Sequence, residues 1–190
     1  MKNQTTGTFE LQPTLENELL LVKPLKSDDF ETLYQVASDP LIWEQHPNKN
    51  RYKKEIFQTF FVGAIDSKGA FLVIDKKTGE QIGSSRYTSY DSEKKSISIG
   101  YTFLSRTCWG KPYNKALKTL MLDHAFRFIE TVYFQVGANN IRSQKAMEKL
   151  GAEKIREEEI TYYGEAPNLN FIYRIEKKKW NQTGVSLISN

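Results

Sequence analysis

A short basic turn stands where the sequence changes from a strand pattern to a helix pattern. It covers Trp109–Lys115, reads WGKPYNK, and places two lysines, Lys111 and Lys115, around the expected start of a helix. A helix N-terminus presents unpaired backbone N–H groups and partial positive charge, so this turn has the chemistry to hold a phosphate group. On this feature alone, an ordinary strand-to-helix turn with solvated lysines is the more frequent explanation.

The Gly-Lys pair in this turn does not make a nucleotide P-loop. That motif requires Ser or Thr directly after the lysine and a further glycine five residues before the second one. Pro112 stands in the first of these positions and Ser105 in the second. A Walker motif is therefore excluded.

A second polar pair opens a shorter predicted helix, residues 141–150. Asn140 is expected to cap this helix, Ser143 lies in its first turn, and Gly151 ends it. An amide and a hydroxyl at such a place can contact a ligand. Taken alone, a plain cap and a solvent-facing hydroxyl are the simpler explanations.

Two loops combine aromatic rings with a carboxylate, a combination that suits a pocket for an amine. One loop holds Trp43 and Glu44, and the other covers residues 162–165 and ends in Glu165. We expect these three side chains, with Tyr101 from a predicted strand, to line an acceptor pocket. Surface turns with aromatic packing are an equally strong alternative.

Length and composition restrict the class of protein. The 190 residues fit one domain, expected to span residues 1–190 with a core over about 18–176 and a loose tail beyond 180. The 39 % hydrophobic content excludes disorder. Because 27 basic residues are interleaved with 23 acidic ones, the expected partners do not include nucleic acid.

Cysteine and histidine are scarce in this chain. The single cysteine, Cys108, cannot form an intramolecular disulfide, and two histidines are too few for a typical zinc site. No segment has the pattern of a signal peptide or a membrane span. We therefore expect a cytoplasmic protein with no metal and no membrane partner.

The helices and strands that must position these residues are predicted from the spacing of apolar residues, which changes along the chain. A strand at 18–24 precedes two helices, the first capped by Ser27 and the second starting at about residue 53. Three strands with short turns follow between residues 70 and 104, and Gly100 in the third indicates a bulge or the close approach of another backbone. The complete order is β-α-α-β-β-β-α-β-α-β-β.

The span from Ile97 to Ala152 resembles the core of the GNAT-type N-acetyltransferase superfamily, particularly its RimJ/RimL-like branch. In that branch a strand ending like IGYTFLS runs into a WGKGYA-like turn and a long helix, and here the turn reads WGKPYN. An Asn-x-x-Ser helix ending in Leu-Gly is matched by Asn140, Ser143 and residues 150–151. The element order matches over roughly residues 19–176. The resemblance implies a mixed α/β fold whose central, mostly antiparallel twisted sheet is flanked by helices.

The resemblance also implies acetyl-CoA as co-substrate. Its pantetheine arm would lie beside the strand at Phe103 and Leu104 and bond to Asn140, and Ser143 would lie near the thioester sulfur as the candidate general acid. Its diphosphate would rest on the basic turn, whose residues are Trp109, Gly110, Lys111, Pro112, Tyr113, Asn114 and Lys115.

The chain departs from the family pattern at four positions. Pro112 replaces a glycine and removes one N–H group, and Asn114 replaces a small residue, so both put cofactor affinity in doubt. Ser98 stands where many relatives carry a glutamate base, and Met147 where many carry a tyrosine acid. The general base is thus left open.

The function that the resemblance implies is transfer of an acetyl group to a primary amine by direct attack in a ternary complex. At pH 7 an α-amine is neutral to roughly 10 % and a lysine to about 0.04 %, which favours a protein N-terminus or a small-molecule amine of low pKa. The alternative is a non-catalytic acyl-CoA-binding module of the same fold. Ten tyrosines and three tryptophans leave room for a homodimer interface.

Overall fold

The computed structural model describes residues 8–161 and 166–182, which form eight strands and five α-helices. The strands are β1 (Leu15–Glu16), β2 (Leu20–Pro24), β3 (Ala70–Asp75), β4 (Gln81–Asp91), β5 (Ser96–Leu104), β6 (Thr131–Gly137), β7 (Glu153–Ile160) and β8 (Asn168–Glu176). The helices are α1 (Phe30–Ala37), α2 (Lys54–Asp66), α3 (Tyr113–Ala125), α4 (Ile141–Leu150) and α5 (Lys177–Gln182). The predicted element order is confirmed, with β1 and α5 as short additions.

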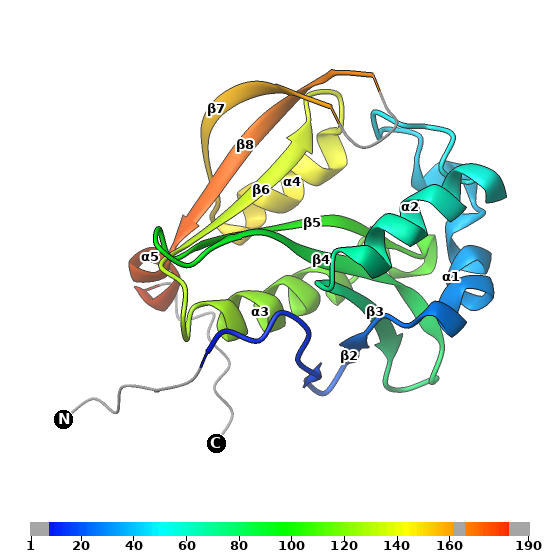
Figure 1. Ribbon diagram of the computed structural model, residues 1–190, viewed down its shortest axis with the longest axis horizontal. Coiled ribbons are helices and arrows are strands. Elements are labelled where there is room, and N and C mark those ends of the chain that lie inside the picture. Colours follow the sequence, from blue (N-terminus) through cyan, green and yellow to red (C-terminus); the bar gives the residue numbers. More distant parts are fainter. Residues whose placement is uncertain (1–7, 162–165, 183–190) are drawn as a thin grey trace.

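All eight described strands form one sheet in the order β1-β2-β3-β4-β5-β6-β8-β7. Neighbouring strands are antiparallel except β5 and β6, whose parallel ladder holds three residue pairs, from Ser96↔Thr131 to Ser98↔Tyr133. Beyond these pairs the two strands diverge (Figure 1). The later halves of β5 and β6 thus face an opening in the sheet.

Helices cover both faces of this sheet, and the two-residue period of the strands separates two cores. In β3, Phe71 and Val73 pack in the core that contains buried side chains of α3, α4 and α5. Ala70 and Leu72 pack in the core formed with α1 and α2. The predicted mixed α/β fold with a mostly antiparallel sheet is confirmed.

A β-bulge bends β5 at the edge of this opening. Between the pairs Ser84↔Phe103 and Arg86↔Gly100, two residues of β5 oppose one residue of β4. One of the two, Tyr101, has a φ of 52°, in the left-handed region that few residues other than glycine adopt. Of the two alternatives that Gly100 indicated, the bulge is the one that the structure shows, because a Cβ at Gly100 would meet nothing within 4 Å.

Two predicted boundaries are wrong. Ser27 does not cap α1, because residues 27–29 form a 3-10 turn and α1 begins only at Phe30. The core does not end at residue 176, because Trp180 on α5 is 2 % exposed and its Nε1 donates to Asp123 Oδ1 at 2.7 Å. The sequence around Trp180 has no hydrophobic period, so the burial of this one large ring could not be predicted from a pattern. Residues 183–190 of the predicted tail lie outside the described residues.

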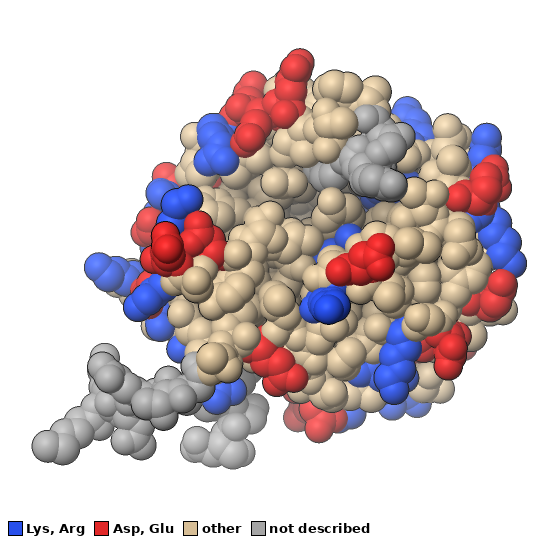
Figure 2. Space-filling view, viewed as in Figure 1, with Lys and Arg blue, Asp and Glu red and all other residues tan. Residues whose placement is uncertain are grey.

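Charges on the surface are dispersed. On the face shown in Figure 2, basic and acidic side chains alternate around the rim and the middle is largely uncharged. Among residues 8–161 and 166–182, no helix has the length and apolar character needed to cross a membrane.

Candidate active site

Two adjoining cavities occupy the opening between β5 and β6. The larger, of about 400 Å³, lies at the start of α3 and is called the turn cavity. The smaller, of about 130 Å³, lies between the diverging strands and is called the wedge cavity. Seven residues line both cavities: Trp43, His46, Thr102, Asn114, Asn140, Ser143 and Ala146. A molecule bound in one cavity can therefore meet a molecule bound in the other.

The backbone at the start of α3 provides unpaired donors beside the turn cavity. Gly110 has a φ of 72°, which a residue with a Cβ adopts only with strain. Pro112 then brings the chain into the helical region with φ −71° and ψ −3°. Because the first helical bond runs from Ala116 N–H to Pro112 C=O, the N–H groups of residues 113–115 have no acceptor within the helix.

Cationic side chains from two elements line the turn cavity. They are Lys111 and Lys115 from the turn and Arg142, Lys145 and Lys149 from α4. The three α4 residues were not predicted from the sequence, although their i, i+3, i+7 spacing places them on one helix face and was the available signal. Together with the helix-start N–H groups, these cations suit a ligand with phosphate groups.

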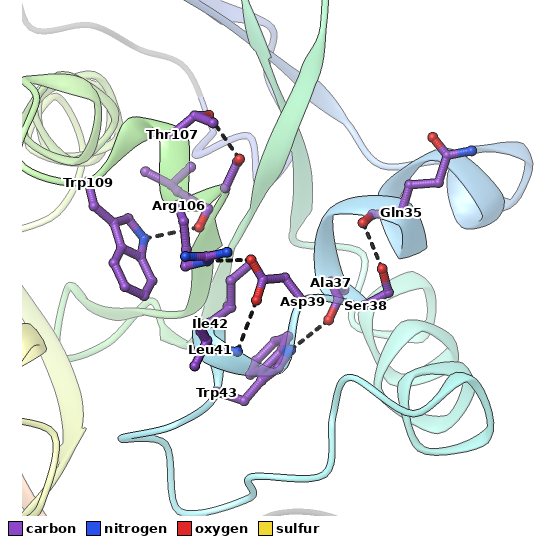
Figure 3. A network of polar contacts seen from close by, with 12 residues as sticks. Gln35, Ala37, Ser38, Asp39, Leu41, Ile42, Trp43, Arg106, Thr107 and Trp109 are labelled. Carbon is purple, nitrogen blue, oxygen red and sulfur yellow. Dashed lines mark hydrogen bonds and ion pairs between the residues drawn. The ribbon is translucent and has the colours of Figure 1, made fainter.

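Two tryptophans in the walls of the turn cavity are held by their indole N–H groups. Each donates to a backbone carbonyl, at 2.7 Å for Trp43 and 3.2 Å for Trp109 (Figure 3). An ion pair between Arg106 and Asp39 ties the segment before Trp109 to the segment before Trp43, and the Arg106 hydrogen bond lowers the pKa of the Asp39 carboxyl. The Arg142 guanidinium lies 3.8 Å from the centroid of the Trp109 ring. These contacts position the start of α4 against the turn.

Asn140 and Ser143 stand at the junction of the two cavities. Asn140 is buried, and its Oδ1 accepts a hydrogen bond from Ser143 N–H at 3.1 Å, which confirms the predicted cap of α4. The cap uses the acceptor side of the amide and leaves the Nδ2 hydrogens for a ligand carbonyl. Because Ser143 follows Asn140 by three residues at the start of α4, the Asn140 amide and the Ser143 hydroxyl both lie at the junction of the two cavities.

Titratable side chains from three segments line the wedge cavity, namely His46, Arg51, Tyr101 and Lys118. Arg51 Nη1 lies 3.1 Å from His46 Nε2. Burial, with a smaller contribution from Arg51, lowers the pKa of His46 to about 3. Burial also lowers the pKa of Lys118 to about 7. Arg51 and Lys118 were not predicted as site residues. Arg51 stands in a polar segment and Lys118 in an amphipathic helix, and neither sequence pattern indicates that a charged side chain is buried.

The structure brings most of the residues singled out in the sequence to these cavities. Asn140, Ser143 and Trp43 line both, Tyr101 lines the wedge cavity, and the turn cavity is lined by Phe103, Leu104, Trp109, Gly110, Lys111, Asn114 and Lys115.

Three of the residues singled out lie elsewhere. The side chains of Pro112 and Tyr113 line neither cavity, because the Tyr113 ring packs on the core and its hydroxyl donates to Asp75. Glu44 is exposed and lines neither cavity, since the chain turns the neighbouring Trp43 inward instead. Glu165 lies outside the described residues.

Residues 19–153 match the family model described as "Acetyltransferase (GNAT) domain". The chain belongs to the GNAT acetyltransferase family. The match runs from the residue before β2 to the first residue of β7 and includes both diverging strands and both cavity-lining helices. The resemblance seen in the sequence is therefore confirmed for the family, whose general activity is acetyl transfer.

Solved GNAT structures share this fold. A candidate acetyltransferase is 26 % identical, with a TM-score of 0.76 over 92 % of this chain and 91 % of that chain. Spermidine N-acetyltransferase from Vibrio cholerae, in complex with CoA and spermine, is 15 % identical, with a TM-score of 0.66 over 87 % and 99 % of the two chains. A candidate ribosomal-protein-serine acetyltransferase from Vibrio cholerae is 16 % identical, with a TM-score of 0.68 over 86 % and 97 %. The sequence has no match among curated proteins.

Proposed function

We propose that this GNAT protein transfers an acetyl group from acetyl-CoA to a primary amine by direct attack in a ternary complex. The observation that carries the proposal is the junction of the two cavities at Thr102, Asn140 and Ser143. The turn cavity has cations and free N–H groups for a diphosphate, and the wedge cavity opens beside it. A thioester placed at the junction would be open to an amine in the wedge cavity.

The residues of the turn cavity fit CoA. Lys111 and Lys115 would hold the diphosphate with the N–H groups of residues 113–115. Phe103 and Leu104 lie past the last β5–β6 pair, so their strand edge is free of β6 and can bond the amides of the pantetheine arm. The α4 cations compensate for the N–H group that Pro112 lacks. When bound, acetyl-CoA supplies an acetyl group activated as a thioester.

The acceptor in this proposal is the α-amine of a protein N-terminus or a small-molecule amine. Ser143 would protonate the leaving thiolate directly or through one water. Buried Arg51 lines the wedge cavity and disfavours an acceptor with several ammonium groups, because like charges repel strongly away from water. The WGKPYN turn and the Asn-x-x-Ser helix further support a place near the RimJ/RimL-like branch. A cytoplasmic location and a homodimer stay predictions from the sequence.

Binding of the diphosphate is tested with the doubly charge-reversed variant Lys111→Glu/Lys115→Glu. Isothermal titration should show a loss of affinity for acetyl-CoA of about 10-fold or more, because two charge-assisted contacts are replaced by repulsion. Affinity for acetyl-pantetheine, which lacks the diphosphate, should hardly change. The matched control is Lys77→Glu/Lys178→Glu, which reverses two exposed lysines that line neither cavity. Equal losses for both ligands would contradict the phosphate assignment.

Turnover is tested by thiol release from acetyl-CoA. The panel contains short peptides with free N-termini, free amino acids, primary alkylamines, an Nα-blocked lysine and spermidine. Release should be fastest with one of the α-amines or simple amines and slowest with spermidine. Tight binding of acetyl-CoA without release for any amine would support the non-catalytic module instead.

A further inference from the structure

A lysine lies buried at the floor of the wedge cavity. Lys118 on α3 is 4 % exposed and follows Asn114, which lines both cavities, by one helical turn. Its Nζ lies 2.6 Å from Thr102 Oγ1 on the bulge of β5 and 3.5 Å from Ser85 Oγ on β4. The centroid of the Phe134 ring on β6 is 5.7 Å from Nζ. The amine is therefore inserted at the place where β5 and β6 diverge.

The surroundings of Lys118 disfavour a permanent positive charge. Its two hydrogen-bond partners are hydroxyl groups, which satisfy an amine without neutralising an ammonium. Burial penalises the charged form and lowers the pKa to about 7. Lys118 can therefore accept and release a proton near neutral pH.

The other titratable groups around this cavity are less suited to that task. They are His46 and Arg51 from the segment between α1 and α2, and Tyr101 from β5. With a pKa of about 3, His46 is a weak base, and both its ring nitrogens already contact Asn48 N–H or Arg51. Among the described residues, β4, β6, α4 and β8 present no further titratable side chain to this cavity.

We propose that Lys118 is the general base that deprotonates the acceptor ammonium, an assignment that rests on the proposed acetyl transfer. The serine at position 98, where many relatives carry a glutamate, lines the same cavity. An amine base from α3 thus serves the cavity that Ser98 lines without a titratable group. A base that titrates near neutral pH is also among the strongest that keep a substantial unprotonated fraction at that pH.

The proton balance of the step is complete. Neutral Lys118 takes one proton from the acceptor ammonium and becomes an ammonium itself. The freed amine attacks the thioester carbonyl, so that a C–N bond forms and the C–S bond breaks. The second proton of the attacking nitrogen passes to the leaving sulfur through Ser143 or water, which yields the amide and free thiol. Lys118 then returns its proton to solvent.

The kinetic test compares Lys118→Met with the wild type, using the best acceptor from the amine panel and a β-fluorinated analogue of it. Fluorine makes the ammonium form more acidic, so the analogue needs less help from a base. With the ordinary amine, kcat should fall by about 100-fold or more. With the fluorinated analogue the loss should shrink to a few-fold, while acetyl-CoA affinity stays unchanged for both. The control is Lys178→Met, which removes an exposed lysine on α5 and should leave kcat unaltered.

A second measurement needs neither turnover nor acetyl-CoA. In protein labelled with 13C at the lysine Cε, the NMR signal that disappears in Lys118→Met belongs to Lys118. This signal should titrate near pH 7 and should shift when the acceptor amine is added alone. Titration near the ordinary lysine value, about 10.4, would overturn the assignment.

The outcomes separate this proposal from the proposed function. If none of the amines in the panel causes the wild type to release thiol, the proposed acetyl transfer itself fails and Lys118 has no ammonium to deprotonate. If the wild type is active but Lys118→Met keeps its kcat, loses the same factor with both amines, or changes only KM, transfer stands and the base assignment is overturned.

Discussion

At the scale of single residues, Asn140 at the start of α4 has a structural role and a proposed ligand-binding role. The cap occupies Oδ1 of Asn140 and the backbone N–H of Ser143, and it leaves the Asn140 Nδ2 group and the Ser143 hydroxyl for the proposed contacts with acetyl-CoA. Each residue can therefore be changed so that one role is kept and the other is removed.

Asn140→Asp should separate capping from binding. Aspartate caps a helix as well as asparagine and its charge suits the helix N-terminus, so the free energy of unfolding should be unchanged or slightly higher. Loss of the Nδ2 donor should weaken acetyl-CoA binding by about 10-fold, the typical effect of one hydrogen bond. Calorimetric titration and urea unfolding check this, with Asn140→Ala as the control that loses both roles. Unchanged affinity in Asn140→Asp would leave only the cap.

Ser143→Ala should impair chemistry more than binding. Negative charge develops on the sulfur only as the C–S bond breaks, so a hydroxyl donor there acts mainly in the transition state. We expect kcat to fall by roughly 10- to 1000-fold with nearly intact acetyl-CoA affinity. The measurement is a single-turnover rate under conditions in which the chemical step is limiting. A full rate in the alanine variant would make Ser143 a structural residue.

At the scale of elements, the position of β5 relative to β4 decides where the cavity wall lies. Gly83 on β4 permits the two backbones to come very close, since a Cβ there would lie 2.1 Å from the Phe103 carbonyl oxygen. Phe103 and its neighbour Leu104 line the turn cavity. The close approach of two backbones therefore occurs at Gly83 on β4, whereas Gly100 on β5 stands beside the bulge.

Gly83→Ala should therefore disturb both the sheet and the site. Because the clash is with backbone, β5 must move, and we expect the free energy of unfolding to drop by about 2–3 kcal/mol with weaker acetyl-CoA binding. Gly100→Ala is the matched control, as its Cβ would meet nothing within 4 Å, and should stay within about 0.5 kcal/mol of the wild type. Urea unfolding of both variants gives the comparison. Equal stabilities would show that the strands adjust freely.

At the scale of the whole molecule, the buried amine of Lys118 links stability to pH. Its pKa is about 7 in the folded chain, against 10.5 as the ordinary value, so between these two pH values the unfolded chain binds the extra proton. Stability must then rise with pH across this interval. Below pH 7 the full cost of burying the charge is present and constant, and above 10.5 it is absent.

Lys118→Met removes this cost and should stabilise the protein on the order of 3 kcal/mol at pH 7, although it removes the proposed base. The gain should shrink steadily as the pH rises towards 10.5. Urea unfolding of wild type and variant at matched pH values checks this, and taking the difference cancels the other titrating groups. If the gain in stability does not depend on pH, Lys118 has the same charge in the folded and the unfolded chain, which would contradict the lowered pKa.

Patterns over a few neighbouring residues determined much of this protein. The order of the elements, the antiparallel strands between residues 70 and 104, the basic turn before α3 and the Asn140 cap all follow from such patterns. Hydrophobic period, turn chemistry and capping depend on residues up to about four positions apart, so a sequence contains them directly. Family resemblance added the expectation of acetyl-CoA, which no local pattern could supply.

Only the tertiary structure decided how the site is assembled. The β5–β6 ladder stops after three pairs, and this opening brings Trp43, Thr102 and Ser143 together from three distant segments. It also decided that Glu44 stays outside, that Tyr113 turns to the core and that Lys118 is buried with two hydroxyl groups, and no carboxylate of the described residues, as hydrogen-bond partners. The physical reason is that cavities and the burial of charge depend on which distant surfaces meet, and the free energy of that packing is summed over the whole chain rather than encoded in any one segment.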